Sequence, residues 1–99
     1  QQPAEYIEKD KNLELLCHSD MGVLVFRYVN GLDQANYCNI NQYIKEKLFF
    51  SGEVLVASTK VNGNFYLKFT IFNPLTTLND IKNILKLIKQ NGNDYQKLN

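Results

Sequence analysis

Two basic residues lie inside segments that are otherwise apolar or aromatic. Arg27, the only arginine of the chain, is in the middle of VFRYV, and Lys68 interrupts YLKFTIF. A cation in such a segment either lies on a solvated sheet face or faces an anion such as a carboxylate or a phosphate. Composition and periodicity leave both interpretations open for each residue.

The other reactive side chains form no recognised catalytic pattern. His18 is the single histidine, and we expect it at a surface turn. Its neighbour Cys17 would point to the opposite face of a strand, so the two would not meet as nucleophile and base. Cys17 and Cys38 fit neither a metal site nor a disulfide framework, and we expect reduced, buried thiols in a cytoplasmic protein. The acidic residues are scattered and there is no glycine-rich phosphate loop. We therefore predict no catalytic residue, no cofactor-binding residue and no metal site.

The size and charge of the chain limit its class. Its 99 residues suit one domain, and 44% hydrophobic with 21% charged residues is ordinary globular composition. A net charge of +1 gives no field that favours nucleic acid, and no apolar run is long enough to cross a membrane. The polar, irregular start at Gln1 is typical of a piece of a longer protein.

The first half of the chain predicts two strands and a helix. Residues 13–17 and 23–29 are apolar runs separated by a polar turn, which favours an antiparallel pair. A helix is expected from 34 to about 50, with Asp33 as its cap and Gly52 at its end. Four apolar or aromatic residues are spaced three or four apart and therefore share one face of this helix: Tyr37, Ile40, Ile44 and Leu48.

The second half predicts a hairpin followed by a helix. Segments 53–61 and 64–72 flank Asn62-Gly63, the residues that a two-residue turn requires. Pro74 ends the second strand, and Thr77 with Asp80 resembles a capping box. The last helix has the apolar stripe Leu78, Ile81, Ile84, Leu85 and Ile88, and is expected to end before Gly92.

The order β-β-α-β-β-α favours an α+β fold, a four-stranded antiparallel sheet with two helices on one face. Alternation places Phe65, Leu67, Phe69 and Ile71 under the helices. The other face, with Tyr66, Lys68, Thr70 and Phe72, is left open and is apolar enough to dock on another domain or subunit. Residues 1–12 are expected to be a linker or the end of a preceding helix, 13–92 the domain, and 93–99 a tail.

The order of these segments resembles a known family. GVLVFRYV, the N-x-x-I helix of NINQYIKEKLFF, the SG that follows, the hairpin and NPLTTLNDI resemble the C-terminal small domain of group II pyridoxal-phosphate-dependent amino acid decarboxylases. These include glutamate, aromatic amino acid and 2,4-diaminobutyrate decarboxylases, which are fold-type I enzymes. The resemblance covers residues 13–92.

The resemblance implies a large domain, in the same chain, that holds pyridoxal phosphate as a Schiff base on a lysine. None of the lysines here matches that motif, so we expect this fragment to bind no cofactor and to be inactive alone. It also implies a homodimer with the active site near the subunit interface, and an amino acid as substrate.

The family often has an arginine at the position of Lys68, which in glutamate-type members can pair with the substrate carboxylate. Lysine is a point charge on a flexible stem, whereas arginine offers a planar fork, so substrate identity stays open. Lys68 is our candidate for a substrate-side or interdomain cation, with Tyr66, Thr70 and Phe72 beside it. Arg27 is expected to anchor its strand to the large domain.

Two alternatives remain from the sequence. One is a free-standing α+β regulatory or binding module whose open face pairs with a second copy. The other is the small domain of a different fold-type I enzyme, an aminotransferase or a lyase.

Overall fold

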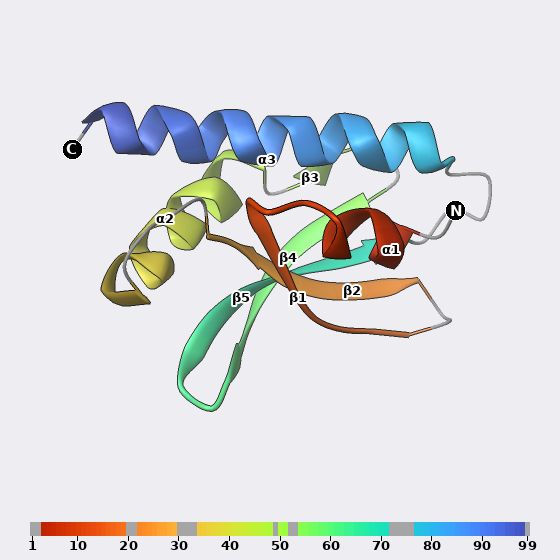
Figure 1. The fold of residues 1–99 in the computed structure, drawn as a ribbon, viewed down its shortest axis with the longest axis horizontal. Coiled ribbons are helices and arrows are strands. Elements are labelled where there is room, and N and C mark those ends of the chain that lie inside the picture. Colours follow the sequence, from red (N-terminus) through yellow and green to blue (C-terminus); the bar gives the residue numbers. More distant parts are fainter. Residues whose placement is uncertain are drawn as a thin grey trace.

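The computed structural model describes residues 3–19, 22–29, 34–48, 50–51, 54–71 and 77–98. Along these segments, two strands separate the first two helices and three strands separate the second and third, as Figure 1 shows. In chain order they are α1 (Pro3–Glu8), β1 (Leu13–His18), β2 (Val23–Tyr28), α2 (Gln34–Lys47), β3 (Phe50–Ser51), β4 (Val54–Val61), β5 (Asn64–Ile71) and α3 (Leu78–Leu98).

The strands form one antiparallel sheet in the order β1-β2-β5-β4-β3. The predicted four-stranded antiparallel sheet is confirmed, and β3 adds a two-residue edge in which Phe50 pairs with Leu55. The predicted helix 34–50 is therefore too long, because α2 ends at Lys47 and the chain pairs as a strand from Phe50.

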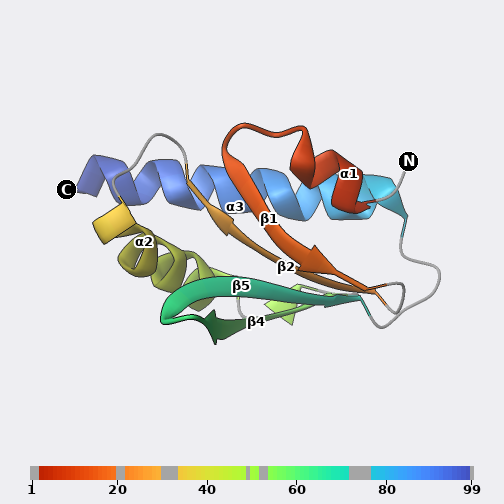
Figure 2. The ribbon, with the colours of Figure 1, turned by 60° about the horizontal axis from the view of Figure 1, so that its bottom comes forward.

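Both long helices cover the same face of the sheet, as predicted (Figure 2). Alternation along β5 sends Phe65, Leu67 and Phe69 into the core beneath them. The helices contribute a matching set of buried residues: Ile40, Ile44, Ile81, Ile84, Leu85 and Ile88.

Helix α1 belongs to the same packed unit. It lies beside β1, and its Ala4 and Ile7 are buried in the common core. Residues 3–8 are thus packed on the domain, whereas the division of the chain at residue 12 stays a prediction.

Two local signals in the sequence are confirmed by the backbone. Asn62 and Gly63 have φ of 53° and 81°, and they join Val61 to its partner Asn64 across a tight hairpin. Thr77 and Asp80 exchange bonds at the start of α3: Thr77 N donates to Asp80 Oδ2 at 3.0 Å, and Asp80 N donates to Thr77 Oγ1 at 3.1 Å. Other predicted boundary residues lie outside the described residues: Asp33, Gly52 and Pro74.

The end of α3 differs from the prediction. The helix continues through Gly92 to Leu98, so the predicted end before Gly92 is wrong, and residues 93–98 of the predicted tail 93–99 are helical. Gly92 is buried, and a Cβ placed there would lie 2.6 Å from the ring of Tyr28. The glycine therefore serves the close approach of Tyr28 to the helix and is not a stop signal.

A buried side-chain amide ties α2 to the end of β2. The side chain of Asn41 accepts a bond from Tyr28 N at 2.8 Å and donates to Tyr28 O at 3.2 Å and to Tyr37 O at 2.8 Å. Asn41 is 0% exposed. The pairing of β2 with β5 ends at Phe26, and beyond it the Asn41 amide satisfies the backbone groups of Tyr28.

We expect Gly92→Ala to lower the free energy of unfolding by about 1–2 kcal/mol, measured by urea titration of the chain. Alanine is the better helix former by about 1 kcal/mol, but overpacking against a buried ring costs about 1–3 kcal/mol, and Tyr28 is only 1% exposed. Asn93→Ala, on the exposed side of the same helix, is the control and should change little. A Gly92→Ala chain as stable as the wild type would mean that the Tyr28 ring can move aside.

Candidate functional site

The sheet face opposite the helices brings the predicted site residues together. Antiparallel pairing sets Lys68 opposite Val25 and Thr70 opposite Val23, on two central strands. Arg27 follows Val25 by two residues and shares its face, with Tyr66 contacting it from β5. Four of the five predicted residues thus lie on one face, and Phe72 lies outside the described residues.

Arg27 is enclosed by groups of its own chain. Its Nε donates to Glu14 Oε1 at 2.6 Å, and Glu14 is its cross-strand partner on β1. The guanidinium carbon lies 4.6 Å from the centroid of the Tyr37 ring and 4.9 Å from that of Tyr66. Its side chain is 8% exposed, so its charge is neutralised and stacked within this domain.

Tyr66 is not the exposed ring that the sequence predicted. It is 6% exposed and lies beneath the guanidinium of Arg27. The prediction failed because Tyr37, from a helix distant in the chain, helps to close this corner. The sequence did not predict that Glu14 or Tyr37 contacts Arg27; Tyr37 was expected only on one helix face with Ile40. A correct register for β1 and β2 would have pointed to Glu14, directly opposite Arg27.

Lys68 is the contrasting cation. It is half-buried between Val25 and Ala57 in the sheet register. Among the described residues no carboxylate forms an ion pair with it. A lysine in apolar surroundings with no ion-pair partner in the described part of the chain is available to an anion supplied from outside. Thr70, also half-buried, adds a hydroxyl on the same strand and face.

The two cysteines differ from the prediction. Cys17 and Cys38 are both free and both exposed, so the expected burial is wrong. An irregularity in β1 between Leu15 and Cys17 sets Cys17 opposite Val25 and His18 opposite Leu24. The two neighbours therefore register with opposite faces.

The described residues do not fit pyridoxal phosphate. That cofactor needs a lysine for its Schiff base and a polar partner for its ring nitrogen. The hollow between α1 and α3 offers Lys9, Lys11 and Lys82, but its one carboxylate, Asp10, is already bonded to Lys89, so no acid in its lining is left for the ring nitrogen. Within the described ranges no group of three or more His, Cys, Asp or Glu could hold a metal, and no helix is long and apolar enough to cross a membrane.

Known proteins resemble the chain in sequence and in fold. No family model matches it. L-2,4-diaminobutyrate decarboxylase from Acinetobacter baumannii is 34% identical over 83 residues, which are 83% of this chain and 16% of that protein. A solved structure from Vibrio parahaemolyticus, the glutamate decarboxylase domain of a diaminobutyrate-pyruvate transaminase and L-2,4-diaminobutyrate decarboxylase, superposes with a TM-score of 0.80 at 25% identity over 93% of this chain. The chain matches the C-terminal small domain of group II pyridoxal-phosphate-dependent amino acid decarboxylases.

The same small-domain fold occurs in more distant decarboxylases. Tryptophan decarboxylase from Catharanthus roseus superposes with a TM-score of 0.72 at 20% identity, which is evidence for the fold alone. The chain spans 16% of the diaminobutyrate decarboxylase and 19% and 20% of the two solved chains. The small domain is thus a minor part of each of these proteins.

We expect Glu14→Gln to lower the free energy of unfolding by about 1–2 kcal/mol, because a buried guanidinium loses its counter-charge. The value is at the low end for charged pairs because the side chain of Glu14 is 49% exposed. Glu46→Gln removes an exposed carboxylate of α2 that has no ion pair among the described residues, and serves as the control. Equal stability of the two variants in urea titration would show that the Tyr37–Arg27–Tyr66 stack alone holds the arginine.

Proposed function

We propose that the full-length protein removes the α-carboxyl group of an L-amino acid as CO2, with this chain as its C-terminal small domain. The observation that carries the proposal is the 34% identity to L-2,4-diaminobutyrate decarboxylase over 83 residues. The fold supports it as well, with a TM-score of 0.80 to a solved structure whose name includes both glutamate decarboxylase and L-2,4-diaminobutyrate decarboxylase. L-2,4-Diaminobutyrate is accordingly the first substrate to test.

The cofactor belongs to the part of the protein outside this chain. Pyridoxal phosphate supplies the electron sink for loss of the carboxyl group, and a lysine of the large domain holds it. Two observations support a cofactor site in the large domain: the chain spans only a small share of each relative, and its described residues fit the cofactor poorly. The proposal includes a homodimer in the cytoplasm, where two exposed free thiols are stable in a reducing environment.

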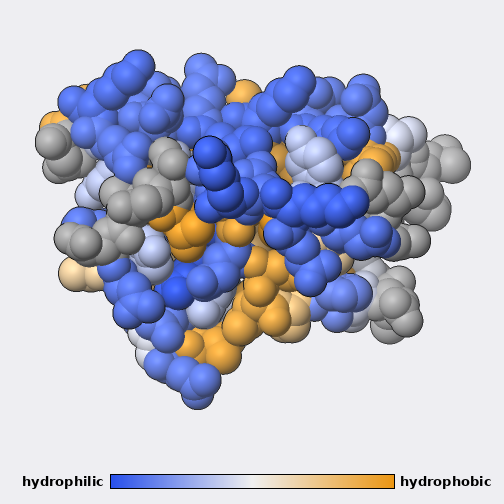
Figure 3. Space-filling model, in the orientation of Figure 1, coloured by the Kyte–Doolittle hydropathy of each residue, from blue (hydrophilic) through white to orange (hydrophobic). Residues whose placement is uncertain are grey.

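In this assignment the open sheet face meets the large domain or the substrate. Figure 3 shows hydrophobic surface over β1, β2 and β5, in contrast to the mostly hydrophilic surface over α3. Leu16 of β1 is 40% exposed and adds to this hydrophobic surface. Lys68 supplies the free positive charge on this face, Thr70 a hydroxyl, and Arg27 with Tyr66 a rigid corner that keeps the face in shape. Phe72, the next residue in the sequence after β5, remains a candidate.

The activity is tested by incubating the full-length protein and pyridoxal phosphate with L-2,4-diaminobutyrate, glutamate and aromatic amino acids, and measuring CO2 release. We expect release from at least one substrate, with the corresponding amine as the other product. Turnover of an amino acid with pyruvate and without CO2 would point to an aminotransferase. No CO2 from any of these substrates would contradict the proposal.

We expect Lys68→Ala in the full-length enzyme to raise KM or to lower kcat by about tenfold or more, since a charge-assisted hydrogen bond contributes about 1.5–3 kcal/mol. Lys68→Arg should retain most of the activity because it keeps the positive charge. Lys60→Ala, at the exposed end of β4, makes the same change of charge away from this face and is the control. Unchanged kinetics in Lys68→Ala would make Lys68 an ordinary surface residue.

A further inference from the structure

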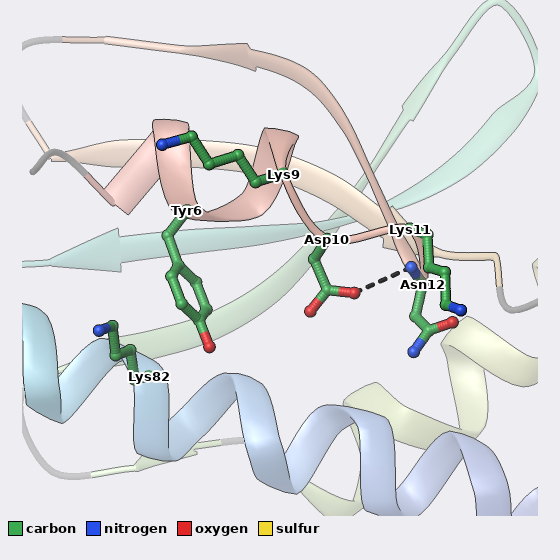
Figure 4. A pocket seen from close by; sticks show the side chains of 6 residues that line it. All are labelled: Tyr6, Lys9, Asp10, Lys11, Asn12 and Lys82. Atoms are coloured by element: carbon green, nitrogen blue, oxygen red, sulfur yellow. Dashed lines mark hydrogen bonds between the residues drawn. The ribbon is translucent and has the colours of Figure 1, made fainter.

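A hollow of about 600 Å³ lies between α1 and α3 (Figure 4). Both helices pack on the core side of the sheet, which is the side away from Lys68. It is lined by Tyr6, Lys9, Asp10, Lys11, Asn12 and Lys82. The Tyr6 ring, the Asp10 carboxylate and the Asn12 amide all point from the α1 side toward α3. The proposed decarboxylase function uses none of these residues.

The acidic residue of the lining is already neutralised. Asp10 Oδ2 accepts a bond from Lys89 Nζ of α3 at 2.6 Å, and Oδ1 accepts one from Asn12 N at 2.9 Å. The Asp10 side chain is only 12% exposed. Its charge is therefore compensated by a lysine outside the lining, and the lysines of the lining contribute a net excess of positive charge.

The three lysines of the lining have no acidic partner among the described residues. Lys82 Nζ lies 5.1 Å from the centroid of the Tyr6 ring, which holds a half-buried ammonium at the edge of the hollow. Lys9 and Lys11 are exposed on the turn after α1. Glu5 and Glu8, the other acids of α1, are also exposed and form no ion pair with these lysines.

We propose that this hollow binds a multivalent oxyanion, a phosphorylated or polycarboxylate small molecule. The hollow offers hydrogen-bond donors of two kinds to such a ligand, neutral ones from the Tyr6 hydroxyl and the Asn12 amide and charged ones from Lys11 and Lys82. The mostly hydrophilic surface over α1 and α3 suits a small, hydrated anion (Figure 3). The site is separate from the open sheet face, so it stands or falls independently of the decarboxylase activity.

The test is isothermal titration of the full-length protein with tripolyphosphate and with citrate, at constant ionic strength. Binding of tripolyphosphate alone assigns a phosphate ligand, binding of citrate alone a carboxylate ligand, and binding of both the shared oxyanion chemistry. Lys11→Gln and Lys82→Gln should each weaken binding about two- to fivefold, the range of partly exposed ion pairs, and the double variant more. Lys97→Gln, in the last turn of α3, is the matched control and should leave the affinity unchanged within about twofold.

One variant has the opposite expected sign. Asp10→Asn removes the partner of Lys89 and leaves a further positive charge beside the hollow, so it should tighten binding about two- to fivefold. A general loss of structure would weaken binding instead, and circular dichroism of the variant checks that it is folded. The proposal is overturned if neither probe binds, or if Lys97→Gln weakens binding as much as Lys11→Gln does.

Discussion

Tyr28, the last residue of β2, is held by two helices at once, and the seating of both helices on the sheet depends on it. Its backbone N–H and carbonyl are both bonded to the buried side chain of Asn41 on α2. Its ring occupies the space that a side chain at position 92 of α3 would need. Hydrogen bonds are directional and a packed ring cannot be compressed, so α2 cannot slide along β2 and α3 cannot rotate without losing one of these contacts. The face carrying Arg27 and Lys68 takes its shape from this arrangement.

Features set by neighbouring residues could be predicted from the sequence. The Asn62-Gly63 turn, the exchange between Thr77 and Asp80, and the alternation of β5 each depend on a few adjacent positions, and each is confirmed. The roles of Asn41 and Gly92 were missed because the residue that requires them, Tyr28, is distant from both in the chain. Gly92 was taken for a helix stop since glycine is common just beyond helix ends, whereas its reason here is a tertiary contact.

Arg27 and Lys68 look alike in sequence and differ in the structure because strand register gives them different neighbours. Register places Glu14 opposite Arg27, and Tyr37 reaches the same guanidinium from α2. The charge of Arg27 is therefore paired inside the domain. Lys68 has Val25 and Ala57 as its paired residues on either side. The contacts of Arg27 also explain why Tyr66 is buried although it lies on the face opposite the core, since the guanidinium covers its ring. A sequence pattern can assign a residue to a face, but it cannot say which side chains from elsewhere will cover that face.

A net charge near zero conceals how the positive charges are distributed. Of the cations described above, Arg27 and Lys89 are paired with Glu14 and Asp10, at 2.6 Å in each case. Each pairing removes one acid from the small number that could balance the remaining lysines. Within the described residues this leaves unpaired lysines on two separate surfaces, the open sheet face and the hollow between α1 and α3. Local potential follows from such pairing and not from the sum over the chain, so a domain with a charge of +1 can present two sites that attract anions. Because the sheet separates these two surfaces, one anion cannot bridge them, and the proposals for the two surfaces are independent of each other.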